Sequence, residues 1–164
     1  MWDAPELHVD RILGLLVAEK VDFVVIGGVA AVLHGSARNT FDLDIAFATD
    51  AANLERLAAA LSPLNVRLRG VGEPVPFALD AATLRRVEVL TLRSDAGDLD
   101  LLARPAGMSR YAALRDRADD FDIEGSPVRV ASIEDLIAMK QAAGRQKDLA
   151  DVAELEAILR LRDR

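Results

Sequence analysis

The spacing of apolar side chains changes along the chain between two periods, one typical of helices and one typical of strands. Leu7–Glu19 places its apolar residues on a single face, which predicts an amphipathic helix. The apolar run Val21–Ile26 predicts a buried strand. Phe41–Ile45 alternates with period two and therefore predicts a strand whose two aspartates point to the same face.

Turn and capping residues delimit the elements that follow. Asp50 is a suitable N-cap for the next helix, and Ser62-Pro63 ends that helix. Gly144 either interrupts the C-terminal helical segment or lies within it, and in the first case Asp148 caps the last helix. The predicted elements are a helix at Ala51–Leu61, a strand at Val66–Leu68, a helical turn at Asp80–Leu84, hairpin strands at Arg86–Leu92 and Asp98–Leu102, a helix at Ser109–Arg117 that can extend to a solvated face at Asp119-Asp120, a strand at Val128–Val130 and helices after Ser132.

These elements predict the α/β class, with a mixed twisted sheet, helices packed on it and C-terminal helices that close a cleft. The 164 residues suit one domain with a core of its own. The chain has no cysteine, which excludes disulfides and thiol chemistry, and its net charge of −7 argues against broad, sequence-blind binding of nucleic acid. Without a membrane-span pattern or a signal-peptide pattern, we expect a cytoplasmic protein.

The segment between the first two predicted strands carries candidate chemistry. Gly27-Gly28 follows a buried strand and permits a turn with close backbone approach, and Val29–Leu33 is a helix whose first amides favour a phosphate. Asp42 and Asp44 then share one face of the next strand. Two carboxylates beside a phosphate-binding turn predict a site for Mg²⁺, or Mn²⁺, and a nucleoside triphosphate. In the alternative interpretation the aspartates cap turns or pair with arginines.

Gly27-Gly28 followed by Asp42-x-Asp44 resembles the signature of nucleotidyltransferases of the DNA polymerase β superfamily. The fuller string GGVAAVLHGSARNTFDLDI resembles more narrowly the AbiEii/MenT-type toxins of type IV toxin–antitoxin systems. The resemblance implies transfer of a nucleoside monophosphate from an NTP to an acceptor hydroxyl, with release of pyrophosphate. It implies one nucleotidyltransferase domain over residues 1–164, with a core at 21–131 and a C-terminal helical part at 132–164.

Three residues before the aspartates are candidates for binding the triphosphate. Arg38 stands four positions before Asp42, and the resembling family includes an arginine at this place. Its guanidinium suits bidentate contact with phosphate, although a surface ion pair is the structural alternative. Ser36 and Thr40 can each add a hydroxyl to the same phosphates.

Enzymes of the superfamily carry a third carboxylate on a later strand. Asp100 matches it best, since GDLDLLARPAG resembles the corresponding segment of this family. Such a group can deprotonate the incoming hydroxyl or complete the metal ligands. Asp98, on the same face, and Glu88, on the partner strand, remain alternatives, and the aspartates can also be the polar face of an edge hairpin.

The string K-x3-G-R-x-K-D-x2-D, which begins at Lys140, resembles the C-terminal motif of the toxin-like enzymes. The resemblance implies that Lys140 grips phosphate, that Arg145 lies near the nucleotide, and that Asp148 is an essential acid that orients Lys140 or activates the acceptor. Asp151 is the alternative to Asp148. In the structural alternative, Lys140 and Asp148 form a salt bridge and Asp148 caps the helix.

Three functions compete at this point. The first is a toxin-like enzyme that modifies RNA, in particular tRNA 3′ ends, or a protein, with a cognate antitoxin as partner. The second is a small-molecule enzyme of the antibiotic-modifying kind, against which the lack of a separate acceptor-binding domain argues. The third is a non-catalytic nucleotide-binding or partner-binding relative. An RNA acceptor predicts a basic groove, and the candidates for it are Arg67, Arg69, Arg85, Arg86 and Arg93, whereas no aromatic platform for a base stands out.

Overall fold

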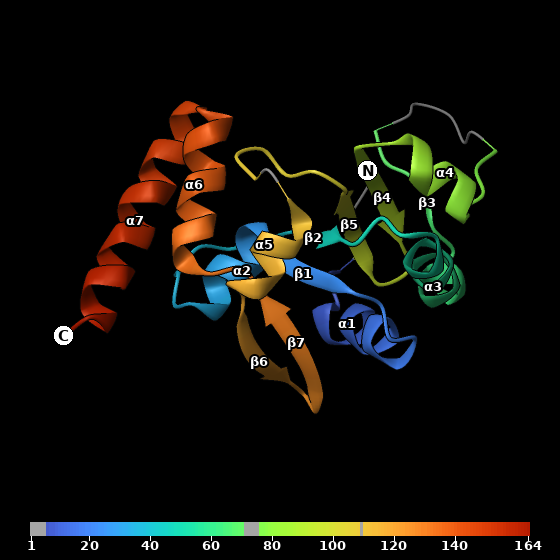
Figure 1. Cartoon of the computed structure of the whole chain (residues 1–164), viewed down its shortest axis with the longest axis horizontal. Helices are drawn as coiled ribbons and strands as arrows, with labels where there is room; N and C mark the ends of the chain where they lie inside the picture. Colours follow the sequence, from blue (N-terminus) through green and yellow to red (C-terminus); the bar gives the residue numbers. More distant parts are fainter. Residues whose placement is uncertain (1–5, 71–75, 109) are drawn as a thin grey trace.

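A computed structural model describes residues 6–70, 76–108 and 110–164 of the chain. Within these residues, one mixed sheet of seven strands has the order β3-β4-β5-β2-β1-β7-β6 (Figure 1). The strands are β1 (Phe23–Ile26), β2 (Asp42–Phe47), β3 (Arg67–Leu68), β4 (Val89–Ser94), β5 (Gly97–Leu102), β6 (Asp119–Ile123) and β7 (Ser126–Val130). The α/β class and the mixed sheet predicted from the sequence are confirmed.

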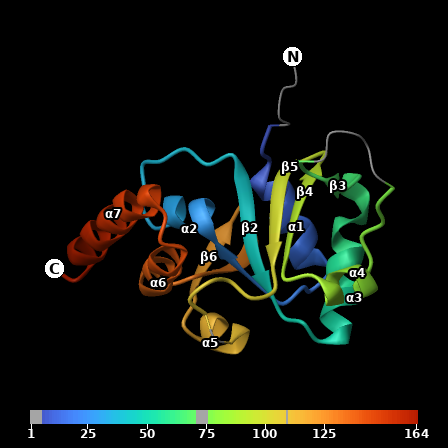
Figure 2. The same cartoon turned by 90° about the horizontal axis from the view of Figure 1, so that it is seen from above.

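The helices cover the sheet and extend beyond its edge. Figure 2 shows α6 and α7 on one side of the central strands β2 and β5, with α3 and α4 on the other. No helix in the described ranges is long and apolar enough to span a bilayer. The helices are α1 (Val9–Ala18), α2 (Gly27–Leu33), α3 (Ala51–Leu61), the 3-10 turn η1 (Ser62–Leu64), α4 (Ala81–Arg86), α5 (Tyr111–Asp116), α6 (Ile133–Ala143) and α7 (Gln146–Arg162).

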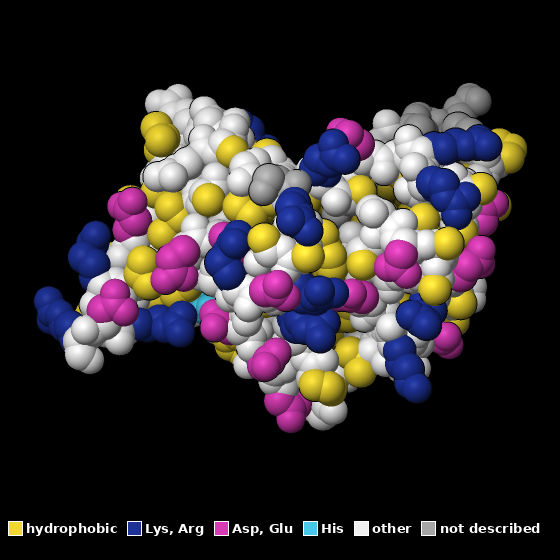
Figure 3. Space-filling model, viewed as in Figure 1, with side chains coloured by type: hydrophobic (Ala, Val, Ile, Leu, Met, Phe, Trp, Pro, Cys, Tyr) yellow, Lys and Arg dark blue, Asp and Glu magenta, His cyan; other side chains and the backbone are white. Residues whose placement is uncertain are grey.

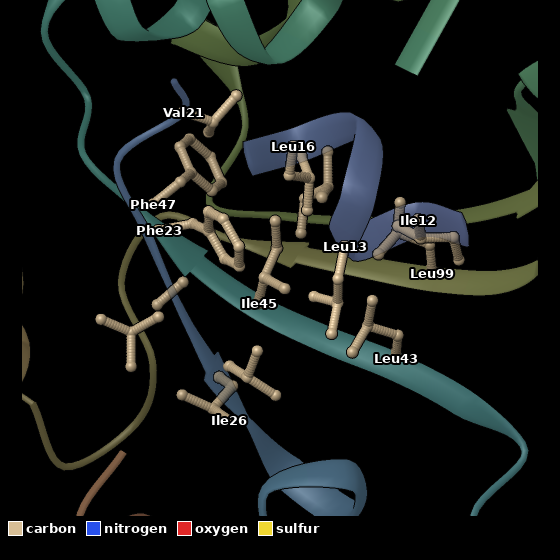
Figure 4. Packing of buried hydrophobic residues seen from close by; sticks show 14 of the residues in the cluster. Ile12, Leu13, Leu16, Val21, Phe23, Ile26, Leu43, Ile45, Phe47 and Leu99 are labelled. Carbon is tan, nitrogen blue, oxygen red and sulfur yellow. The ribbon is translucent and has the colours of Figure 1, made fainter. Parts of the chain in front are cut away.

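The main core lies between α1 and the inner face of the sheet (Figure 4). Alternate residues of β2 and β5 point to this face because side chains on a strand alternate. The facing side chains are fully buried: Ile12, Leu13 and Leu16 from α1, and Leu43, Ile45 and Leu99 from the sheet. The intervening aspartates of the two strands must then point to the opposite face, which α1 leaves open.

Strand register places the aspartates of two strands side by side. β2 runs parallel to β5, with Asp42 opposite Asp98 and Asp44 opposite Asp100. β2 runs antiparallel to β1, where Asp44 is opposite Ile26. The strand that precedes the glycines therefore ends beside the strand that carries the carboxylates.

The prediction of a helix extending through Asp119-Asp120 is wrong. Helix α5 ends at Asp116, and Asp119–Ile123 is the edge strand β6, paired antiparallel with β7. Phe121 is partly buried whereas Asp120 is exposed, so this acidic segment alternates with the period of a strand. Ser109, where we expect the helix to begin, lies outside the described residues.

Gly144 separates the last two helices. It ends α6 with a φ of +65°, a left-handed conformation that glycine adopts without steric cost. Helix α7 then begins at Gln146, with Arg145 as its N-cap. Asp148 is the third residue of the helix and accepts a hydrogen bond from the Arg145 amide, so it caps the helix from inside the first turn.

Candidate active site

Three carboxylates meet on the open face of the sheet, at β2 and β5. Asp42, Asp44 and Asp100 each offer an oxygen atom, and these atoms lie within 4.8 Å of one another. All three side chains are partly buried. The parallel register of β2 and β5 produces this arrangement, because it sets Asp44 beside Asp100 with Asp42 one pleat away.

The cluster carries more negative charge than its surroundings neutralise. Burial, reinforced by the carboxylates of Asp42 and Asp100, raises the pKa of Asp44 to about 8. Burial also raises the pKa of Asp100 above its ordinary value, although the Arg69 guanidinium opposes that shift. The Oδ1 atom of Asp44 is buried without a hydrogen-bond partner among the described residues. Three convergent carboxylates with an unpartnered buried oxygen fit a hard divalent cation.

Gly27 is required for the position of Asp44. A Cβ atom built on Gly27 would stand 2.0 Å from Oδ2 of Asp44, and the residue has a φ of +68°. Gly28 lies close to Thr40, whose Oγ1 would be 2.8 Å from a Cβ there. The two glycines form the first turn of α2, and this turn packs directly against β2 and the segment before it.

Arg69 contacts the cluster, which the sequence did not predict. Its guanidinium lies 2.5 Å from Oδ1 of Asp100 and 3.9 Å from Oδ2 of Asp42. Backbone pairing sets this position, since the Arg69 amide donates to the carbonyl of Thr91 on β4. Arg69, which we predicted to belong to a basic groove, therefore contacts the carboxylates.

The structure distinguishes the three candidates for a third carboxylate by their surroundings. Asp98 is buried and pairs with Arg93 at 2.9 Å. Glu88 is exposed and precedes β4, at the far end of the hairpin. Asp100 is the candidate that converges with Asp42 and Asp44.

A pocket of about 370 Å³ opens beside the carboxylates, and its opposite wall comes from the C-terminal helices. We call the carboxylate side the sheet wall and the side formed by α6 and α7 the helical wall. The pocket is lined by the predicted residues Gly28, Ser36, Arg38, Thr40, Asp42, Asp44, Asp100, Lys140 and Arg145, together with Lys147, Asp151 and Glu154.

Asp151, on the helical wall, contacts two cations that are predicted to bind phosphate. Its carboxylate pairs with Arg38, and its Oδ2 atom lies 3.0 Å from Nζ of Lys140. Ser36 donates to Oε1 of Glu154 at 2.5 Å. The loop before β2 is thus fastened to α7 by two contacts, both of which use groups expected to bind phosphate.

Asp148 lies behind this surface. Its side chain is 1 % exposed and lies 3.6 Å from Lys140. It also accepts from Nε of Arg145 at 2.9 Å, and this hydrogen bond holds the pKa of Asp148 below its ordinary value. The structure thus brings Lys140, Arg145 and Asp148 together, with Asp151 rather than Asp148 on the pocket surface.

Phe41 stands at the pocket with 78 % of its surface exposed. It directly precedes Asp42, and its side chain is the most exposed of the large apolar side chains in the described ranges. The sequence predicted no aromatic platform because Phe41 looks there like one more apolar position of a strand. The strand begins one residue later, at Asp42, and leaves the ring at the mouth of the pocket.

Several solved structures share this fold. The lincosamide antibiotic adenylyltransferase LnuA, solved with lincomycin bound, has a TM-score of 0.60 at 16 % identity, over 93 % of this chain and 99 % of that chain. An antigenic nucleotidyltransferase-like protein from Paracoccidioides brasiliensis has a TM-score of 0.54 at 20 % identity, over 94 % of this chain and 78 % of that chain. At these identities the likeness establishes the fold alone.

Sequence comparison adds a family. Residues 9–162 match the model of a family described as nucleotidyltransferase of unknown function (DUF6036). No curated protein sequence matches the chain significantly. The family match covers all the residues that form the pocket.

Proposed function

Because the chain belongs to the DUF6036 family of nucleotidyltransferases, we propose that it transfers a nucleoside monophosphate from an NTP to a hydroxyl of an RNA acceptor and releases pyrophosphate. The observation that carries this proposal is the three-carboxylate cluster facing a pocket lined by cations. A metal ion needs the carboxylates, and a triphosphate needs the cations opposite them.

Asp42, Asp44 and Asp100 are the residues that would hold Mg²⁺, which neutralises charge on the reacting phosphate when it is bound. Lys140, Arg38 and Arg145 would hold the phosphates that leave as pyrophosphate. Their position across the pocket from the carboxylates supports this division. Most of the rate acceleration then comes from positioning and charge neutralisation.

Asp100 has a second suitable property. Burial raises its pKa above the ordinary value, and a carboxylate of raised pKa accepts a proton more readily. We assign Asp100 the removal of the proton from the acceptor hydroxyl. Gly28, Ser36 and Thr40 line the pocket between the two walls, where they can contact the phosphates.

A small-molecule acceptor is the alternative, and it has specific support. We expected the lack of an acceptor-binding domain to argue against it. The present chain, however, spans 99 % of the lincosamide adenylyltransferase, so a chain of this size is enough for an antibiotic-modifying enzyme. RNA is preferred because four arginines, Arg85, Arg86, Arg104 and Arg110, line a hollow next to β4 and β5. A toxin-like role would add a cognate antitoxin as partner.

The test is incubation with Mg²⁺ and each α-³²P-labelled NTP, with total tRNA, with lincomycin or without acceptor. The double variant Asp42→Ala, Asp44→Ala is the inactive counterpart, and Asp10→Asn, an exposed carboxylate on α1, is the control for a simple loss of charge. We expect label in tRNA with the wild-type chain and with Asp10→Asn, and none with the double variant.

The other outcomes separate the alternatives. Label on lincomycin but not on tRNA would replace RNA by a small molecule. Label on the protein itself would indicate protein nucleotidylation. If no label moves and Mg²⁺-dependent NTP binding is the same with and without the two aspartates, the assignment of the active site is wrong.

A further inference from the structure

A second hollow, of about 690 Å³, lies where β5 ends and β4 begins, past Leu102 and Val89. Four exposed arginines line it: Arg85 and Arg86 from the end of α4, Arg104 after β5 and Arg110 before α5. We call this hollow the arginine pocket. Glu88 is the acidic residue among those that line it, so the arginine pocket is positively charged in a chain whose net charge is −7.

The arginines of this pocket differ from those at the candidate active site. In the described part of the chain, Arg85, Arg104 and Arg110 take part in no ion pair and no side-chain hydrogen bond. By contrast, Arg69 contacts the catalytic carboxylates and Arg93 pairs with Asp98. Figure 3, in the view of Figure 1, shows Lys and Arg side chains and an acidic side chain beside the notch between the α6 side and the α4 side. Guanidinium groups without protein partners are available to an anionic ligand.

The open face of the sheet connects the arginine pocket to the carboxylates. Asp100 and Leu102 point to this face, opposite Thr91 and Val89 on β4. Val89 is 53 % exposed although it is apolar, so this part of the face is uncovered. Arg104 follows two residues after Leu102, about 13 Å along the chain from Asp100.

The geometry of nucleotidyl transfer also favours an acceptor that lies between the carboxylates and the arginine pocket. Nucleotidyl transfer is an in-line displacement, so the acceptor hydroxyl must approach from the side opposite the departing pyrophosphate. The helical wall supplies the cations for pyrophosphate, which leaves the β5 and β4 side of the carboxylates for the acceptor. That side leads to the arginine pocket. An extended acceptor with several anionic groups can place its hydroxyl at Asp100 and contact more than one arginine of the pocket.

We propose that the arginine pocket binds the phosphodiester backbone of a single-stranded RNA acceptor, with the reacting end of the RNA placed at Asp100. This inference rests on the proposed function and names the residues that select its acceptor. Arg85, Arg104 and Arg110 each contact phosphate, and Val89 and Leu102 lie beneath the last nucleotides. Phosphate contacts position a nucleic acid without reading its sequence.

The test measures binding of a fluorescein-labelled single-stranded RNA to the intact chain by fluorescence anisotropy, over a series of salt concentrations. The triple variant Arg85→Gln, Arg104→Gln, Arg110→Gln is compared with Arg11→Gln, Arg56→Gln, Arg160→Gln, which removes three exposed arginines from α1, α3 and α7. Each lost phosphate contact lowers the slope of log Kd against log salt by about 0.7 for a single strand. We expect the pocket variant to bind more than tenfold more weakly with a slope lower by about 2, and the control to bind within about twofold of wild type.

Equal weakening in both triple variants, or no RNA binding by the wild-type chain, would overturn the inference. Binding of polyglutamate at the arginine pocket in place of RNA would also overturn it, in favour of an acidic protein partner. If the triple variant does not fold by circular dichroism, Arg104→Gln and Arg104→Lys replace it, and only the charge-removing change should lower the slope, by about 0.7.

The outcome is separable from that of the proposed function. Label transfer to an acceptor without any RNA binding would contradict the role of the arginine pocket and support the nucleotidyltransferase activity. Loss of RNA binding in the pocket variant with Mg²⁺-dependent NTP binding unchanged would support the arginine pocket even if no label moved.

Discussion

The two walls of the candidate active-site pocket differ in whether their charged side chains are paired within the protein. On the sheet wall, Asp42, Asp44 and Asp100 converge, and the pKa of Asp44 is raised to about 8 by burial and by its two neighbours. On the helical wall, Lys140 and Arg145 are both paired with carboxylates of α7. On the sheet wall, the carboxylates repel one another in the folded state. On the helical wall, the cations are neutralised by carboxylates of the protein itself.

The difference indicates which residues are placed for a ligand and which for the fold. Like charges on adjacent strands destabilise a sheet, so their convergence favours a bound cation as the reason for it. Internally paired charges stabilise helices and also bind ligands, and their position alone does not separate the two roles. Variants that act on one wall and not the other do separate them.

The largest expected effect comes from Gly27→Ala, which acts on the sheet wall. The new methyl group displaces the Asp44 carboxylate, since a Cβ there would lie 2.0 Å from Oδ2. We expect transfer to fall by about 10²-fold, as misplacement of a catalytic group by about 1 Å does. Radiolabel transfer measures the rate. Gly125→Ala is the matched control, because Gly125 has a φ of +88° but no atom within 4 Å of its Cβ position. A similar loss in both variants would attribute the effect to backbone strain.

Asp148→Asn and Asp151→Asn separate the two carboxylates of the helical wall. Asp148 is 1 % exposed and caps α7, so its replacement is expected to lower the free energy of unfolding by about 2 kcal/mol. Asp151 lines the pocket, and its replacement releases Arg38 and Lys140 for the triphosphate. We expect the KM for NTP to fall by about fivefold in Asp151→Asn.

Urea denaturation and initial rates measure these two effects, and Asp163→Asn at the exposed end of α7 is the control. If Asp148→Asn abolished transfer while leaving stability unchanged, Asp148 would be the essential acid that the family resemblance implies, and the structural interpretation would be wrong.

Phe41→Ala tests the mouth of the pocket. A base stacked on an aromatic ring gains about 1–3 kcal/mol, so the KM for NTP is expected to rise by about tenfold. Stability should not change, because 78 % of the Phe41 surface is already exposed. Phe41→Trp should keep the wild-type KM. Leu149→Ala, on α7 with 65 % exposure, is the control for loss of an exposed apolar side chain.

The most gradual effect is the dependence of stability on pH. Since the pKa of Asp44 is raised from 3.8 to about 8 in the folded chain, the folded state binds more protons than the unfolded state between these values. The free energy of unfolding without metal therefore falls as pH rises through this window. Mg²⁺ should reverse the loss at the upper end, because it binds the deprotonated carboxylates.

Thermal unfolding at several pH values, with and without Mg²⁺, measures this dependence. Asp44→Asn should flatten the pH profile and make the unfolding midpoint insensitive to Mg²⁺. A wild-type profile without slope would show that the three carboxylates are solvated and do not interact.

The sequence predicted most of the fold, because strand and helix periodicity act over short distances, and the family resemblance implied that Asp100 joins Asp42 and Asp44. It did not predict β6, whose acidic residues resemble those of a solvated helix, although Phe121 alternates with them. It did not predict the contact of Arg69 with Asp100, which depends on how β3 pairs with β4. Pairing between segments distant in the chain is not visible in the spacing of residues.

The contact between Asp151 and the cations of the pocket has a consequence for the end of the reaction cycle. A phosphate that binds Arg38 and Lys140 competes with the Asp151 carboxylate, which contacts both cations. In the proposed reaction, the same carboxylate would neutralise the two cations again once pyrophosphate has left. Under the proposed function, the last helix competes with pyrophosphate for Arg38 and Lys140, and we expect the strength of the two Asp151 ion pairs to affect the rate of turnover.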